Sequence, residues 1–110
     1  MESRDRQVLE KILDEAGVII DLLSGYDFGL FLSDEKTKRA SCMTLINIGE
    51  LVKTLSENLR LSNVDIPWRA IAGLRDVTAH RYQTLRMEDI WETCQTDLPL
   101  FRKQIESLLS

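Results

Sequence analysis

One nine-residue stretch of the chain carries the side chains best suited to acid–base chemistry. Residues 74–82 read LRDVTAHRY and include the only histidine of the sequence, His80. Imidazole titrates near neutral pH and suits proton transfer, whereas the planar guanidinium of Arg75 suits phosphate. Asp76 lies four residues before His80, so on a helix the carboxylate shares a face with the imidazole and is expected to orient it. These residue types favour phosphodiester chemistry, with an ordinary surface position as the alternative for Asp76.

The spacing of this motif raises a geometric problem. Arg75 and His80 are five residues apart, which on a regular helix separates them by about 140° around the axis. We therefore expect either that the helix ends within the motif or that a second chain completes the site. His80 and Tyr82, two residues apart, also point to different sides unless the helix frays between them.

Four arginines are concentrated around the motif. Arg69, Arg75, Arg81 and Arg86 lie in a stretch whose single nearby acid is Asp76, in a chain with a formal net charge of −4. The stretch is predicted to bind anions locally, and a solvated helix face is the alternative. Metal-dependent chemistry fits poorly because the acids are dispersed, so no metal ligands and no cofactor are predicted.

Composition limits the class of protein. A chain of 110 residues with 44% hydrophobic content is expected to form a single domain, residues 1–110, with a small core that dimerisation would help to stabilise. The acidic balance argues against a general nucleic-acid coat protein. Cys42 and Cys94 are far apart with no histidine close to either, which predicts reduced core thiols. No signal peptide or membrane anchor is visible, so a cytoplasmic location is expected.

Helical periodicity predicts the elements that must position the motif. One apolar stripe runs from Leu9 to Leu23 and ends before Gly25, and a second, capped by Ser33 or Asp34, runs to Leu59 after a turn over residues 26–32. Residues 63–65 interrupt the pattern. A third, shorter helix has Pro67 in its first turn and carries the motif, with apolar positions at Trp68, Ile71 and Leu74. A fourth stripe over residues 87–108 is expected to kink at Pro99. With no strand pattern, the sequence predicts an all-α fold, a compact up-down bundle of four main helices.

The motif and its surroundings resemble a known family. The segment IPWRAIAGLRDVTAHRY, residues 66–82, preceded by NIGE and followed by DIWETCQTDLPLF, is similar to the HepT-like branch of the HEPN superfamily. The branch is marked by Arg-x-x-x-x-His-x-Tyr, which Arg75, His80 and Tyr82 satisfy, and the likeness covers nearly the whole chain.

The resemblance implies a function. Such proteins are small all-α toxins of HEPN/MNT toxin–antitoxin systems and act as homodimeric, metal-independent ribonucleases with the arginine and histidine as the catalytic pair. A minimal nucleotidyltransferase antitoxin is the implied partner, and it transfers AMP from ATP to the motif tyrosine, here Tyr82. RNA is the implied substrate, with Arg69, Arg81 and Arg86 as candidate RNA contacts.

The chain also departs from the family pattern. Asp76 stands where the family often has asparagine, Arg81 where it often has an acid, and Leu51 and Val52 follow Glu50 where small alanines are common. Glu50 is a weaker candidate for the cleft, against a helix-surface acid as the alternative. Two other functions remain open, a non-catalytic nucleotide- or RNA-binding adaptor subunit of the nucleotidyltransferase and a purely structural helical dimer.

Overall fold

The computed structural model describes residues 1–80 and 82–110, and for residues 75–80 it describes the helical backbone without the side chains. Every regular element in this part of the chain is helical, which confirms the predicted all-α class. The described helices include two short ones, α2 and α4, that the periodicity did not predict.

The N-terminal hairpin is built from α1 (Ser3–Leu22) and α3 (Glu35–Lys53). Gly25 follows α1 with φ of 81°, the left-handed conformation expected of a glycine after a helix. The expected turn over residues 26–32 is wrong, because Asp27 caps a short helix, α2 (Phe28–Ser33), by accepting a hydrogen bond from the backbone N–H of Leu30 at 2.8 Å. Asp34 then caps α3, as predicted, by accepting from the N–H of Thr37 at 3.1 Å.

The second predicted helix is shorter than its apolar stripe. It ends at Lys53, and a separate helix, α4 (Glu57–Ser62), carries Leu59. The break has a local cause, because Ser56 takes an extended conformation and its hydroxyl caps α4 by accepting from the N–H of Leu59 at 3.2 Å. Leu59 therefore continues the apolar stripe on a different helix.

The C-terminal half contains the motif helix and a long irregular helical run. Helix α5 (Trp68–His80) begins directly after Pro67, one residue later than predicted, and is followed by the 3₁₀ turn η1 (Tyr82–Thr84). The last run comprises α6 (Met87–Glu92), the π-helical segment η2 (Thr93–Asp97) and α7 (Leu98–Leu109). Pro99 lacks an N–H, and its ring crowds the carbonyl four residues earlier at Gln95. That carbonyl lies in the π-helical segment, so the departure from α-helical geometry falls where the proline disturbs the backbone hydrogen bonds of the helix.

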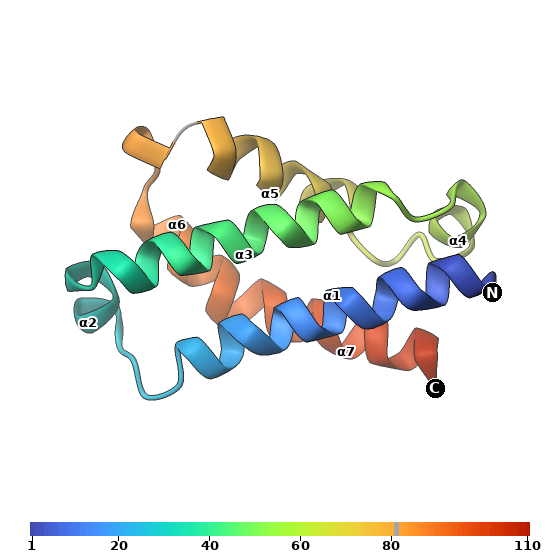
Figure 1. Cartoon of the computed structure of the whole chain (residues 1–110), viewed down its shortest axis with the longest axis horizontal. Helices are drawn as coiled ribbons and strands as arrows, with labels where there is room; N and C mark the ends of the chain where they lie inside the picture. The colour runs from blue at the N-terminus through green and yellow to red at the C-terminus, as the bar shows by residue number, and fades with distance from the viewer. Residues whose placement is uncertain (81) are drawn as a thin grey trace.

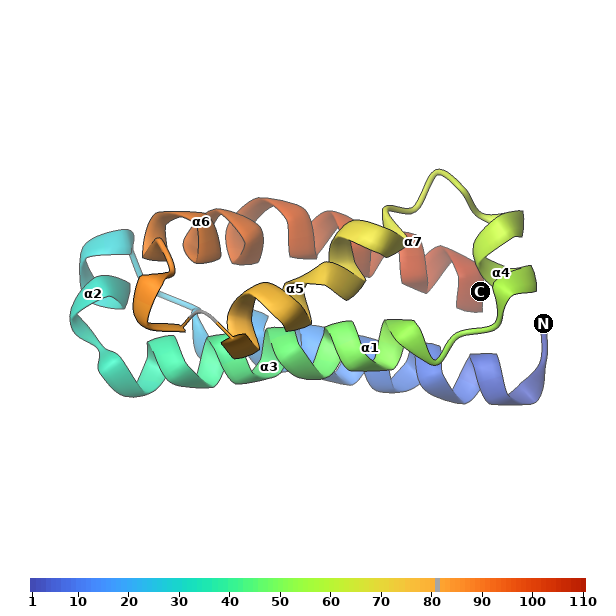
Figure 2. The same cartoon turned by 90° about the horizontal axis from the view of Figure 1, so that it is seen from above.

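The long helices run back and forth along one axis (Figures 1 and 2). Helix α3 packs against α5 on one side and α1 on the other, and α1 also packs against α7. One end of the molecule holds α2 and η1, and the opposite end holds α4 and both termini. The end of the motif helix therefore lies beside the start of α3.

One apolar core joins these helices. Its largest fully buried side chains come from α1, α2, α3 and α7: Leu9, Ile12, Ile19, Phe31, Leu45, Ile48, Val52, Leu98, Phe101 and Ile105. Cys42 and Cys94 are free and buried, as predicted, and burial raises the pKa of Cys42 to about 11 and that of Cys94 to about 12. Both thiols therefore stay protonated and unreactive near neutral pH. Among the described residues, no helix combines the length and apolar character needed to cross a membrane.

Candidate active site at the end of the motif helix

Helix α5 is held in place at its first turn. The Trp68 side chain is 6% exposed, and its indole N–H donates to the carbonyl oxygen of Asn63 at 3.0 Å. Its ring meets Phe101 of α7 edge-on, with centroids 6.0 Å apart. Ile71, one turn later, is also buried. The predicted apolar side of this helix is therefore confirmed at Trp68 and Ile71, and it fixes the direction in which the motif extends.

Within the motif, the side chains of residues 75–80 and the whole of residue 81 lie outside the described residues. The roles predicted for Arg75, Asp76, His80 and Arg81 therefore stay predictions. The backbone of positions 75–80 is helical, so positions 75 and 80 belong to one helix, about 7.5 Å apart along its axis and about 140° apart around it. The helix does not end between these two positions, and a second chain remains as the expected means of completing the site.

Tyr82 lies just beyond α5, in η1, as the sequence predicts. Its hydroxyl donates a hydrogen bond to Glu35 Oε1 at 3.0 Å, and the guanidinium carbon of Arg39 lies 4.6 Å from the centre of its ring. Tyr82 is half-buried and packs against the apolar core. These contacts join the end of the motif helix to the first turns of α3.

Glu35 is the centre of a small charged cluster. Its carboxylate pairs with Lys38 at 3.0 Å and with Arg39 at 2.9 Å. The hydrogen bond from Lys38, followed by the one from Tyr82, lowers the pKa of Glu35, so the carboxylate is ionised at neutral pH. Burial, followed by the bond to Glu35, raises the pKa of Tyr82. At neutral pH the phenol therefore remains protonated, and the carboxylate beside it accepts its hydrogen bond.

Two members of this cluster carry no signal in the sequence. Glu35 and Arg39 precede Tyr82 by more than forty residues, and their i,i+4 spacing is typical of an ordinary helix-surface ion pair. Only the packing of η1 against the start of α3 makes them neighbours of the tyrosine.

Among the described residues, the other candidate RNA contacts lie on three different elements. Arg69 is exposed in the first turn of α5, eleven residues and about 16 Å of helix before His80. Arg86 is 71% exposed at the start of α6 and pairs with Glu88 at 3.3 Å. Glu50 is exposed on α3 and borders a shallow hollow next to Lys11. The predicted anion-binding stretch is thus distributed over the whole length of α5 and beyond it.

No group of three or more histidine, cysteine, aspartate or glutamate side chains is placed to hold a metal ion within the part of the chain that the structure describes.

Comparison with known proteins identifies the family. The protein family described as "Ribonuclease HepT-like" matches residues 12–108 of this chain. The chain belongs to the HepT-like ribonuclease family. One similar protein is "Putative RNase TTE0752" of Caldanaerobacter subterraneus subsp. tengcongensis, which is 36% identical over 104 residues that cover 94% of this chain and 93% of the relative. Another is "Probable ribonuclease HepT" of Thermococcus cleftensis, which is 30% identical over 108 residues that cover 98% of each chain.

A third relative, "Putative RNase MJ0127" of Methanocaldococcus jannaschii, is 36% identical over 104 residues, covering 94% of this chain and 86% of the relative. No solved structure matches the chain. The family match spans α3, α5 and η1, so the HepT-like resemblance seen in the motif extends to the elements that place Tyr82.

Proposed function

We propose that this HepT-like chain is a metal-independent endoribonuclease that acts as a homodimer. The observation that carries the proposal is the family match over residues 12–108 to relatives named as RNases, with Arg75, His80 and Tyr82 at the family spacing. In this mechanism His80 exchanges protons, Arg75 binds and stabilises the scissile phosphate, and Asp76 orients the imidazole.

Two chains solve the proton balance of the reaction. The 2′-hydroxyl of RNA attacks the adjacent phosphorus and gives up its proton, while the departing 5′-oxygen takes one, leaving a 2′,3′-cyclic phosphate and a 5′-hydroxyl. One histidine per chain supplies one acid–base group, and a two-fold dimer supplies the second. The dimer also brings two copies of Arg75 to the charge that develops on the phosphoryl oxygens.

The decisive experiment is cleavage of total cellular RNA by the purified protein in EDTA. We expect fragments that end in cyclic phosphate, and their absence in EDTA together with their appearance on adding Mg²⁺ would refute metal independence. No cleavage under either condition, with retained nucleotide binding, would instead favour the adaptor subunit. That second candidate is favoured by Asp76, a negative charge beside the motif arginine where the family often has asparagine.

We further propose that the chain is the toxin of a toxin–antitoxin pair and that a nucleotidyltransferase antitoxin adenylylates Tyr82. In this step the phenolic oxygen attacks the α-phosphorus of ATP, pyrophosphate leaves, and the phenolic proton passes to a base. The hydrogen bond from Tyr82 to Glu35 supports this assignment, because it places an ionised carboxylate where it can serve as the base that receives the phenolic proton. The attached AMP adds a phosphodiester charge and a nucleoside two residues from His80, where it blocks RNA.

Intact mass after coexpression with the neighbouring nucleotidyltransferase gene tests this step. The chain has a second tyrosine, Tyr26, whose hydroxyl also donates to a carboxylate, that of Asp34 at 2.7 Å, so Tyr26→Phe is a matched control. We expect adducts of AMP mass in the wild type and in Tyr26→Phe, and none in Tyr82→Phe. Adducts that persist in Tyr82→Phe, or an adenylylated protein that still cleaves RNA, would overturn the proposal.

A further inference from the structure

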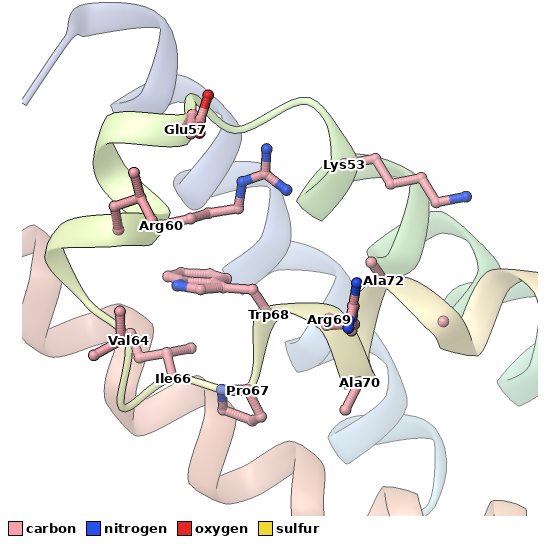
Figure 3. Close-up of a pocket in the computed structure, with 12 residues that line it drawn as sticks. Lys53, Glu57, Arg60, Val64, Ile66, Pro67, Trp68, Arg69, Ala70 and Ala72 are labelled. Atoms are coloured by element: carbon pink, nitrogen blue, oxygen red, sulfur yellow. The ribbon is translucent and has the colours of Figure 1, made fainter.

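A second feature of α5 lies at its other end. A groove of about 770 Å³ opens between the end of α3, helix α4 and the first turns of α5 (Figure 3). Its floor is formed by the buried indole of Trp68. Three cationic side chains line it, each from a different element, namely Lys53 of α3, Arg60 of α4 and Arg69 of α5. We call this surface the basic groove.

The charge of the basic groove is opposite to that of the protein. Its three cations are accompanied by one acid, Glu57, whereas the whole chain has a formal net charge of −4. In Figure 3 the Arg60 side chain extends over Trp68, and within the described residues neither Arg60 nor Arg69 forms an ion pair. Arg60 Nε is buried and has no hydrogen-bond partner there. Guanidinium groups of this kind bind phosphate oxygens.

The rims of the groove suit a nucleic-acid strand better than a small anion. Leu61 and Val64 are 64% and 79% exposed and provide apolar surface beside the cations. A single phosphate would not use this surface, but the riboses and bases of a strand would lie against it while its phosphates reach Arg60 and Arg69. Trp68 is too deeply buried for a base to stack on it, and contacts to phosphates carry no sequence information.

The groove and the motif share one helix. Arg69 precedes position 75 by six residues, about 9 Å along the axis of α5 and about 120° around it, so a strand that crosses the helix obliquely reaches both positions. We propose that the basic groove is a docking site for the phosphate backbone of single-stranded RNA on one side of the cleaved bond. The inference rests on the proposed ribonuclease function, and it assigns Lys53 and Arg60 to substrate binding for the first time.

The test measures binding separately from cleavage. A fluorescently labelled 20-nucleotide single-stranded RNA is titrated into His80→Ala, alone and combined with Arg60→Gln and Arg69→Gln. The matched control combines His80→Ala with Arg6→Gln and Lys103→Gln, which remove the same charge from exposed positions on α1 and α7 outside the groove. We expect Kd to rise roughly tenfold in the groove variant, and the slope of log K against log salt to fall by about 1.4, at about 0.7 for each lost phosphate contact. The control should change neither.

Further measurements complete the test. Because Arg60 is half-buried, the exposed Arg69→Gln is measured alone, and it should give about half of the slope change with an unaltered melting temperature. With His80 intact, the groove variant should raise KM for the 20-nucleotide RNA. Equal binding by groove and control variants would overturn the docking site while normal cleavage upheld the ribonuclease. RNA binding without cleavage by the wild type would instead refute the ribonuclease. A groove variant that becomes monomeric by sedimentation would assign the groove to contact between chains and overturn the proposal.

Discussion

A buried carboxylate near the N-terminus determines where α4, and with it Arg60, is placed. Asp5 is 2% exposed in the first turn of α1. Its Oδ1 accepts a hydrogen bond from the backbone N–H of Ser56 at 2.9 Å, and its Oδ2 accepts one from the Ser56 hydroxyl at 2.6 Å. Ser56 is the N-cap of α4. Asp5→Ala removes both bonds and leaves the backbone N–H of the half-buried Ser56 without its partner.

The magnitude follows from these two bonds. A hydrogen bond to a charged group contributes about 1.5–3 kcal/mol net, and two bonds from one residue overlap because both order the same turn. We expect Asp5→Ala to lower the free energy of unfolding by about 2–4 kcal/mol. For a domain of this size, at about 4–5 °C per kcal/mol, that corresponds to a fall in Tm of roughly 8–20 °C. The matched control Asp14→Ala removes an exposed carboxylate from the same helix and should stay within about 0.5 kcal/mol of the wild type.

The assay is urea unfolding of Asp5→Ala, Ser56→Ala and the double variant, followed by circular dichroism. The double variant should be less destabilised than the sum of the single ones by about 1–2 kcal/mol, because both remove the same contact. Below its unfolding temperature, Asp5→Ala should also bind RNA more weakly, since Arg60 then loses its fixed position, while dinucleotide cleavage is retained. A loss below about 1 kcal/mol, equal to that of Asp14→Ala, would refute the reasoning.

Three further predictions concern the motif, the assembly and the dependence on pH. Arg75→Ala and His80→Ala should each reduce EDTA-resistant cleavage by at least about 100-fold, with the double variant little worse; full activity in His80→Ala would remove histidine from the mechanism. Sedimentation should show a homodimer at micromolar concentration, and a monomer that cuts RNA at the normal rate would contradict the shared site. The hydrogen bonds from Tyr26 and then Thr37 lower the pKa of Asp34 below its ordinary value of 3.8. The stability that the ionised Asp34 carboxylate contributes to the fold is therefore present above pH 3.8 and is lost as pH falls through the lowered pKa of the folded state. The difference in urea midpoint between the wild type and Asp34→Asn should disappear on acidification.

The fold class and the long helices could be predicted because they depend on local periodicity. The stripe from Leu9 to Leu23 lies on α1 and its end, and the caps at Gly25 and Asp34 take the conformations that their residue types favour. The break after Lys53 could not be predicted in the same way, because the apolar stripe continues through it to Leu59. The local cap by Ser56 is held in place by a hydrogen bond from its backbone N–H to Asp5, fifty-one residues away in the sequence.

The candidate site divides along the same line. Its motif could be found from the sequence because Arg75, His80 and Tyr82 lie within eight residues and their types suit one chemistry. The partners of Tyr82 could not, since Glu35 and Arg39 read as a surface pair on another helix. The described arginines of the predicted anion-binding stretch, Arg69 and Arg86, lie at the start of α5 and beyond its end, because sequence proximity does not measure separation along a helix.

The division of α5 into two ends explains how one short helix can serve two purposes. Its first turn is fixed by the apolar contacts of Trp68 and borders a groove whose cations suit any RNA backbone, whereas its last turn leads to Tyr82 and the charged cluster on α3. AMP attached at Tyr82 would stand beyond the end of α5, which lies about 16 Å of helix from Arg69, too far to occupy the basic groove directly. If both proposals hold, adenylylated protein should therefore lose cleavage while keeping part of its salt-dependent affinity for RNA. Complete loss of RNA binding on modification would instead mean that the strand is held at the Tyr82 end alone, since a group at that distance cannot screen the groove.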